Sequence, residues 1–202
     1  RFGSPVNRSL LNVFFLTDRN KKDTGIDNGD VSPRDVKSVG VIGAGIMGAG
    51  IAAANVKRDV PAFLTDANAD ALARGVKNVI EEVAYNKETK GLDPEKAIAA
   101  APLLRETSSV KGLGDCDLVI EAVVENAEIK KSIYSKLEPL LSDEAILASN
   151  TSTIPITGLA AELKRPEQFV GIHFFNPVRR MKLVEVIRGE QTSDETVATA
   201  VA

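Results

Sequence analysis

The stretch that decides the fold reads VGVIGAGIMG and runs from Val39 to Gly48. It follows a β-branched run that starts at Val36, and an alanine-rich segment continues after it to about Lys57. β-Branched residues favour strands, glycines favour tight turns and alanines favour helices. The pattern therefore predicts a strand, a turn and a helix in that order.

Three glycines in this stretch occupy the positions that a dinucleotide-binding turn requires. Gly43 allows the tight turn after the strand, Gly45 lets the backbone approach a pyrophosphate, and Gly48 lets the helix lie close to the sheet. Asp66 follows at the end of a second short strand, where a carboxylate accepts hydrogen bonds from the adenosine ribose and repels a 2′-phosphate. The spacing predicts NAD rather than NADP. A flavin is the minor alternative, and Asp66 has a second interpretation as a turn residue.

The rest of the chain alternates between strand and helix patterns. Apolar runs typical of strands cover residues 61–66, 118–122, 145–149, 168–173 and 183–187. Helical patterns cover residues 69–88 and 126–141, and shorter ones begin at Asp93-Pro94, Pro155 and Ser193. This alternation is typical of an α/β fold, here a Rossmann-type, doubly wound, mainly parallel sheet.

The composition excludes several classes of protein. Of the 202 residues, 26% are charged and 44% are apolar, which is the balance of a soluble globular protein. The net charge of −3 gives no basic excess that would favour nucleic acid, and no apolar run is long enough to span a bilayer. One histidine and one cysteine are too few for a metal site. Cys116 cannot form an intramolecular disulfide, so we expect it to be a small buried residue in a reducing compartment, the cytoplasm.

The first 35 residues differ in character from the rest. Residues 1–17 show an amphipathic helical pattern, and residues 18–35 are polar and typical of a solvated linker. The apolar positions of the helical pattern, which imply a partner surface, are Val6, Leu10, Val13, Phe14 and Leu16. We expect the domain proper to span residues 36–202. We also expect an excised fragment of a longer protein, because the last residues interrupt a helical pattern.

Four motifs and the glycine loop together carry a resemblance to a known family. The motifs are EAVVEN at 121–126, SNTSTI at 149–154, HFFNP at 173–177 and MKLVEV at 181–186. With them, residues 36–202 resemble the L-3-hydroxyacyl-CoA dehydrogenase family. The segment before residue 36 resembles the stretch that joins hydratase to dehydrogenase in the fused α-subunit of bacterial fatty acid oxidation complexes.

The resemblance implies an activity and a set of site residues. It implies NAD-dependent oxidation of L-3-hydroxyacyl-CoA to 3-ketoacyl-CoA in fatty acid β-oxidation. It implies His173 as the catalytic base and Glu185 as its partner, with Ser152 and Asn176 positioning the reactants. Besides Gly43, Gly45 and Gly48, the cofactor site that it implies consists of Met47, Asp66, Val123, Val124, Glu125, Lys130, Asn150, Ser152 and Asn176.

The resemblance also implies partners. In the family an all-helical domain follows this one and closes the cleft over the substrate, and it is absent from this sequence. An enoyl-CoA hydratase domain would precede residue 1. A thiolase subunit is a further implied partner.

The residue types suit this chemistry, and each also has a structural interpretation. His173 is the one histidine and ends a predicted strand, the edge where open α/β sheets bind ligands. Glu185 follows 12 positions later, which leaves room for a second strand to return beside the first and orient the imidazole. Alternatively, His173 is a structural histidine and Glu185 an outward-facing charge. The alternative for Ser152 and Asn176 is that they are cap or turn residues. The alternative for Glu125 and Lys130 is that they are solvated charges on a helix.

Two other functions remain open. The β-hydroxyacid dehydrogenases of the phosphogluconate type share a similar glycine loop but use a lysine as proton carrier, which the HFFNP motif at 173–177 argues against. The second alternative is a nucleotide-binding module without turnover in isolation, because the helical domain that closes the cleft is absent.

Overall fold

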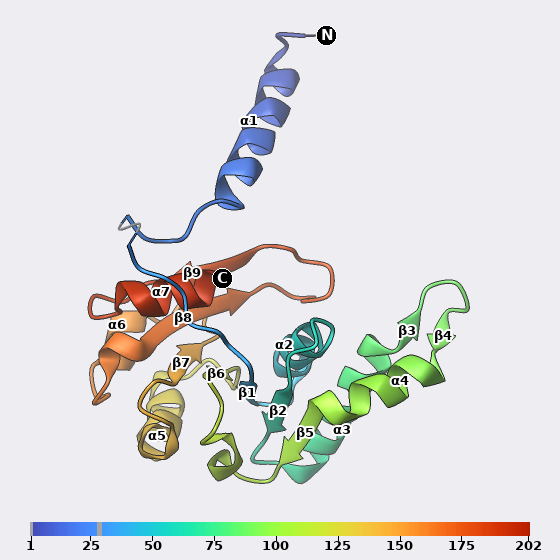
Figure 1. The fold of residues 1–202 in the computed structure, drawn as a ribbon, viewed down its shortest axis with the longest axis vertical. Helices are drawn as coiled ribbons and strands as arrows, with labels where there is room; N and C mark the ends of the chain where they lie inside the picture. Colours follow the sequence, from blue (N-terminus) through green and yellow to red (C-terminus); the bar gives the residue numbers. More distant parts are fainter. Residues whose placement is uncertain (1, 28–29) are drawn as a thin grey trace.

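A computed structural model describes residues 2–27 and 30–202, and its centre is a seven-stranded sheet (Figure 1). The strand order is β5-β2-β1-β6-β7-β8-β9, with β5 to β8 parallel and β9 antiparallel to β8. The strands are β1 (Val39–Ile42), β2 (Ala62–Thr65), β5 (Leu104–Thr107), β6 (Leu118–Glu121), β7 (Ile146–Ser149), β8 (Phe169–Phe174) and β9 (Val184–Ile187). The predicted Rossmann-type, mainly parallel sheet is confirmed.

Helices cover both faces of this sheet. They are α2 (Ile46–Val56), α3 (Ala69–Val83), α4 (Pro94–Ala100), α5 (Ala127–Leu137), α6 (Ile156–Ala160) and α7 (Asp194–Val201). Alternate strand residues face opposite sides, so Val41 and Ile120 pack with α2 and α3, whereas Ile42 and Val119 pack with α5. Figure 1 shows α2 and α5 on opposite sides of the strands. The two apolar clusters form the core.

The chain changes direction within the sheet at β1. It runs outward from β1 to β2 and β5, then returns to place β6 on the other side of β1. Loops that leave the carboxyl ends of β1 and β6 therefore diverge and leave a crevice between them, which is where open α/β sheets bind ligands.

The glycine loop depends on very short approaches between backbone segments. Gly43 has φ +100°, a conformation that favours glycine. A Cβ on Gly48 would lie 1.7 Å from the Gly43 carbonyl oxygen. A Cβ on Gly75 of α3 would lie 2.8 Å from the Ala44 carbonyl oxygen. The loop is thus clamped between α2 and α3, and the role of Gly75 was not predicted.

Some element boundaries differ from those predicted. Strand β1 starts at Val39 rather than Val36, because the Lys37 and Ser38 N–H groups donate to the Asp117 carboxylate instead of joining a strand. Helix α5 ends at Leu137 rather than at 141, because Pro139 has no N–H to donate to the carbonyl four residues earlier, and a 3₁₀ turn follows.

Two further differences concern the segment after α3. This helix ends at Val83 rather than at 88, because β3 (Tyr85–Asn86) and β4 (Gly91–Leu92) pair as a small antiparallel hairpin. Strand β5 was not predicted. Its sequence, Leu-Arg-Glu-Thr, is half exposed at the sheet edge and lacks an apolar alternation.

The N-terminal helix α1 (Pro5–Asn20) stands away from the sheet in Figure 1 and buries none of its residues. Its apolar side chains, including Leu10 and Phe14, are exposed. The helix begins at the N-cap Ser4, whose hydroxyl accepts a hydrogen bond from the Asn7 N–H. The helical pattern predicted for residues 1–17 is confirmed over the described residues. Arg1 of that segment and residues 28–29 of the predicted linker lie outside the described residues. Within residues 2–27 and 30–202, no helix is long and apolar enough to cross a membrane.

Gly75→Ala tests the clamp on the glycine loop. We expect it to lower the free energy of unfolding by about 1–3 kcal/mol, since the added methyl meets backbone that must move. Gly158→Ala is the matched helical control: its Cβ meets nothing within 4 Å, so we expect unchanged or slightly higher stability. Urea unfolding of the three proteins checks this, and equal midpoints for Gly75→Ala and the unchanged chain would contradict it.

Candidate cofactor and catalytic site

The loops that follow five parallel strands supply the candidate site. The glycine loop follows β1, Asp66 follows β2, and residues 122–125 follow β6. Residues 150–153 follow β7, and His173 lies near the end of β8. Because these strands are parallel, all of these groups reach the same edge of the sheet.

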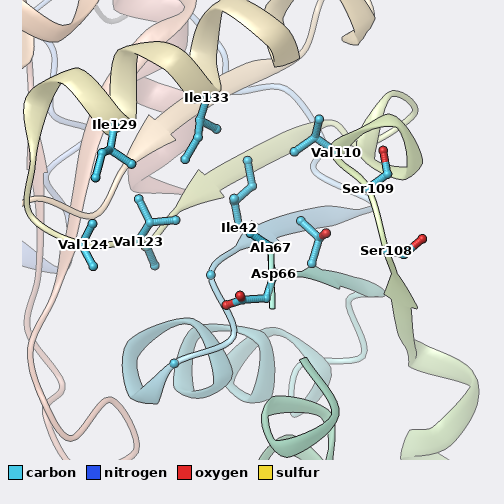
Figure 2. A pocket seen from close by; sticks show the side chains of 14 residues that line it. Ile42, Asp66, Ala67, Ser108, Ser109, Val110, Val123, Val124, Ile129 and Ile133 are labelled. Carbon is cyan, nitrogen blue, oxygen red and sulfur yellow. The ribbon is translucent and has the colours of Figure 1, made fainter. Parts of the chain in front are cut away.

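A pocket of about 480 Å³ opens at the crevice between β1 and β6 (Figure 2). In Figure 2, Val123 and Val124 lie on one side of it and Ser108, Ser109 and Val110 on the other. Its complete lining is Ile42, Gly43, Gly45, Thr65, Asp66, Ala67, Ser108, Ser109, Val110, Ala122, Val123, Val124, Ile129 and Ile133. The pocket is mostly apolar, with the Asp66 carboxylate as its charged group, which suits a flat base attached to a ribose.

The N-terminus of α2 faces this crevice and has no internal cap. Gly45 is the N-cap residue and makes no side-chain hydrogen bond, and the first turn of the helix contains no acidic residue. A Cβ on Gly45 would meet nothing within 4 Å, so the space beside the uncapped N–H groups is open. Free N–H groups and the helix dipole both favour an anion. The residues present therefore fit a dinucleotide pyrophosphate.

Two backbone N–H groups hold the Asp66 carboxylate at the crevice. One carboxylate oxygen accepts a 2.8 Å hydrogen bond from the Ala44 N–H of the glycine loop. The other accepts a 2.8 Å bond from the Asn68 N–H, so the turn interpretation also describes part of its role. Each oxygen keeps a second lone pair that can accept a hydroxyl hydrogen.

A buried charged cluster, which we call the Glu121 cluster, lies beneath the loop after β6. It consists of Glu121, Lys130, Tyr134 and Ser149, none more than 1% exposed. The Lys130 Nζ lies 2.7 and 2.9 Å from the two Glu121 oxygens. The Tyr134 and Ser149 hydroxyls donate to Glu121 Oε2 at 2.6 and 2.8 Å. Val123 N–H donates to Oε1 at 2.7 Å, which connects the cluster to the pocket lining.

Sequence reasoning did not identify this cluster. The interpretation of Lys130 as a solvated helix charge is wrong, because its side chain is 0% exposed. A signal was present in the sequence: Glu121 ends an apolar strand, and Lys130 and Tyr134 are four residues apart on one face of a helix. Burial raises the pKa of Tyr134 well above its ordinary value, and the Glu121 carboxylate raises it further.

Glu125 connects this cluster to the turn after β7. Its Oε2 lies 3.4 Å from the Lys130 Nζ. Its Oε1 accepts hydrogen bonds from the Thr151 hydroxyl at 2.5 Å and from the Ser152 and Thr153 N–H groups at 3.1 and 3.3 Å. Burial opposes ionisation here, but the Thr151 hydroxyl, the Lys130 charge and the two N–H groups together hold the pKa of Glu125 below its ordinary value. Glu125 thus has fixed partners although its side chain is 39% exposed.

His173 and Glu185 face each other on the antiparallel strands β8 and β9. They are register partners, and His173 Nδ1 lies 2.8 Å from Glu185 Oε2. A carboxylate oxygen accepts, so this contact suits the tautomer that carries the imidazole proton on Nδ1. The Phe175 ring packs against the imidazole, with ring centroids 4.5 Å apart.

A second cavity, of about 210 Å³, contains this pair and Ser152. Asn150 Oδ1 accepts a 2.8 Å hydrogen bond from the Phe174 N–H, which joins the ends of β7 and β8. The structure thus brings Ser152 beside the pair.

Six of the predicted site residues line neither cavity: Met47, Gly48, Glu125, Lys130, Asn150 and Asn176. Met47 is half-buried and Asn176 is exposed, and neither lines the two cavities. Asn176 makes no side-chain hydrogen bond within the described parts of the chain. Lys130 is fully buried and contacts Glu121, which accepts from the Val123 N–H of the pocket lining, and Glu125. In the ranges 2–27 and 30–202, no group of three or more His, Cys, Asp or Glu side chains is placed to hold a metal ion.

The sequence and the fold of this chain both match known proteins. Residues 38–202 match the family model described as 3-hydroxyacyl-CoA dehydrogenase, NAD binding domain. The fatty acid oxidation complex subunit alpha of Idiomarina loihiensis is 45% identical over 188 residues, which are 93% of this chain and 26% of that protein. That of Pseudomonas putida F1 is 45% identical over 198 residues, 98% of this chain and 27% of that protein.

Solved structures agree with these matches. The 3-hydroxybutyryl-CoA dehydrogenase of Escherichia coli K12 superposes with a TM-score of 0.77 at 39% identity, over 83% of this chain and 35% of that one. The (S)-3-hydroxybutyryl-CoA dehydrogenase PaaH1 of Ralstonia eutropha gives 0.76 at 36% identity, over 83% and 61%. The chain therefore belongs to the 3-hydroxyacyl-CoA dehydrogenase family and contains its NAD-binding domain. It spans about a quarter of the length of the α-subunits that it matches.

The raised pKa of Tyr134 leads to a spectroscopic prediction. In the Tyr85→Phe variant, whose one remaining tyrosine is Tyr134, we expect no rise in phenolate absorbance from about pH 9 to about pH 11, although free tyrosine titrates near pH 10. The denatured variant is the control and should show the rise. Because only the unfolded state ionises in this range, stability should also fall above about pH 10. A normal phenolate titration of the folded variant would contradict the buried contact.

Proposed function

We propose that this chain is the NAD-binding part of an L-3-hydroxyacyl-CoA dehydrogenase, which oxidises L-3-hydroxyacyl-CoA to 3-ketoacyl-CoA in fatty acid β-oxidation. The observation that carries the proposal is the His173–Glu185 pair, which shares a cavity with Ser152 at the sheet edge that also holds the dinucleotide pocket. Family membership supports the same reaction.

His173 is the proposed catalytic base. Oxidation of a secondary alcohol requires removal of the hydroxyl proton, and Nε2 of His173 is the nitrogen that would accept it. Glu185 would stabilise the imidazolium that results, as a carboxylate bonded to Nδ1 does in other proton-transfer sites. Ser152 and Asn176 are the proposed positioning groups for substrate and nicotinamide, Ser152 on the strength of its place in the cavity and Asn176 on the resemblance.

NAD is the proposed cofactor, and it would supply the hydride acceptor for the substrate carbon. The uncapped end of α2 at Gly45 and the carboxylate of Asp66 support this choice, because they suit a pyrophosphate and an unphosphorylated ribose. Val123 and Val124 would contact the cofactor from the loop after β6. The proposed cofactor site is completed by Met47, Glu125, Lys130 and Asn150. The last three would act through the contacts that hold the loops of the site.

We propose that residues 1–35 are a linker from an upstream enoyl-CoA hydratase domain and that residues 36–202 form the NAD-binding domain. The similarity to α-subunits of fatty acid oxidation complexes supports this division. A helical domain that closes the cleft and a thiolase subunit are the other proposed partners. The cytoplasm is the proposed location, in keeping with the buried free thiol of Cys116.

A module that binds NAD without turnover is the second candidate for this chain by itself. The observation in its favour is that Glu185 remains half exposed, so the His173 cavity is open to solvent on one side. Hydride transfer needs water excluded and the substrate held. A β-hydroxyacid dehydrogenase of the phosphogluconate type is disfavoured by the family match.

Titration with NADH tests the cofactor assignment. We expect the chain to bind NADH and to prefer it over NADPH, because Asp66 repels a 2′-phosphate. Asp66→Ala should weaken NADH binding roughly tenfold, the loss typical of a hydrogen bond to a charged group, and should relax the preference. Nucleotide fluorescence measures both affinities, with Asp70→Ala on the exposed first turn of α3 as the control. Unchanged affinity and preference in Asp66→Ala would refute the role of this carboxylate.

Turnover separates the two candidate functions. With acetoacetyl-CoA and NADH, we expect little activity from this chain and full activity from a chain extended through the helical domain. In the extended chain, His173→Ala should lower kcat by about 10²–10⁴-fold, the contribution of general acid–base catalysis, with little change in NADH affinity. Full activity of the short chain would exclude the module interpretation, and full activity of His173→Ala would exclude this residue as the base.

A further inference from the structure

The imidazole of His173 has two neighbours of different kinds. Glu185 Oε2 lies 2.8 Å from its Nδ1. The Phe175 ring lies against the imidazole, with ring centroids 4.5 Å apart and ring planes inclined at 52°. The side chain of His173 is 16% exposed and that of Glu185 is 50% exposed. The polar contact of this histidine therefore lies within reach of water.

The hydrogen bond to Glu185 fixes the imidazole incompletely. Charged pairs at solvent-exposed positions contribute little net free energy, because water competes for both partners. The torsion that turns a histidine ring is broad and roughly two-fold. A half-turn about the Cβ–Cγ bond exchanges Nδ1 with Cδ2 and Nε2 with Cε1, so an unrestrained ring would present a carbon to the substrate for part of the time. A second restraint on the ring is needed.

Strand β8 places His173 and Phe175 on the same face. Successive residues of an extended chain point to opposite sides. Ile172 and Phe174 accordingly pack with the apolar cluster that contains α2. His173 lies on the opposite face, where it shares a cavity with Ile156 of α6, and the contact between the two rings shows that Phe175 lies there too.

The backbone that carries Phe175 is held by both neighbouring strands. β7 pairs with β8 as far as Gly171, and the Phe174 N–H then donates to Asn150 Oδ1 at 2.8 Å, so this side chain continues the pairing past the end of β7. On its other side Phe174 pairs with β9. Phe175 itself does not line the cavity that contains the histidine, so its ring supports the imidazole without filling the space for a substrate.

We propose that Phe175 is a positioning residue for His173: its ring holds the imidazole in the orientation in which Nδ1 faces Glu185 and Nε2 faces the substrate. The consequence for catalysis rests on the proposed function. The restriction of the ring is independent of that function.

The sequence allows a direct test, because His173 is the one histidine and gives a single set of imidazole NMR signals. Phe175→Leu keeps an apolar side chain and removes the flat ring. Phe175→Tyr retains the ring and is the conservative variant. Phe174→Leu is the matched control, since it removes the neighbouring ring from the opposite face of the strand.

Two NMR measurements on the 202-residue chain report on the imidazole. In Phe175→Leu we expect the order parameter of the Cδ2–H bond, from ¹³C relaxation, to fall below about 0.6, the range of a flexible group. Nitrogen shifts at about pH 9, where a histidine is ordinarily neutral, should show the ratio of the Nδ1–H to the Nε2–H tautomer falling about three- to tenfold, as expected for the loss of an aromatic pair. Phe175→Tyr should preserve both quantities.

The control separates positioning from stability. Phe174→Leu should lower the melting temperature, because it removes buried apolar volume, yet leave the order parameter and the tautomer ratio unchanged. In a chain extended through the helical domain, Phe175→Leu should lower kcat with acetoacetyl-CoA by roughly tenfold and leave the KM for NADH within about twofold, and Phe175→Tyr should restore most of the rate.

The possible results lead to distinct conclusions. An unchanged order parameter and tautomer ratio in Phe175→Leu overturn the inference, as does an equal change in Phe174→Leu. If Phe175→Leu does not fold, Phe175→Met replaces it, because a flexible thioether fills the space without a flat ring, and the same loss of order is expected. If His173→Ala keeps full activity, the proposed role of the base fails, and the NMR measurements still decide whether Phe175 holds the imidazole.

Discussion

The close approach of α2 to the end of β1 is the constraint on which the rest of the structure depends. No side chain fits between Gly48 and the carbonyl of Gly43, so the helix starts directly at the sheet edge with its N–H groups free. The same approach places Ala44 against Gly75 and lets its N–H reach Asp66. The uncapped end of the helix and the position of the Asp66 carboxylate, which we propose bind the pyrophosphate and the ribose, are therefore consequences of one backbone contact.

Strand order turns this local feature into a site. Because β6 returns to the other side of β1, the loop at 122–125 faces the glycine loop across the crevice. The antiparallel strand β9 then adds a group that a purely parallel sheet would lack at this edge, the Glu185 carboxylate beside His173. The proposed cofactor pocket and the His173–Glu185 pair thus share an edge of the sheet, although they lie on different pairs of strands. The Glu121 cluster is bonded to the loop after β6 through the Val123 N–H, and Lys130 contacts Glu125, which in turn accepts from the Ser152 N–H.

Much of this was predictable because it depends on residues close in sequence. The glycine loop and the strand–helix alternation are local patterns, and the predicted pairing of strands around His173 and Glu185 needed only a short connection. Strand β5 and the end of α3 were missed because tertiary contacts decide them: β5 is a strand through its pairing with β2, and Asn86 pairs with Gly91 where a helical pattern continued. Gly75 was missed because its importance depends on what packs against it.

By itself, the sequence determined the class of fold, the family and the chemistry available, since glycines, one histidine and the acids following strands restrict what the chain can bind. Only the tertiary structure decided which charges are exposed. Lys130 and Glu125 look alike in sequence as polar residues near a helix start, yet one is buried between two carboxylates and the other binds the 151–153 turn. The physical reason is that burial depends on every element packed around a side chain, and local sequence carries little of that information.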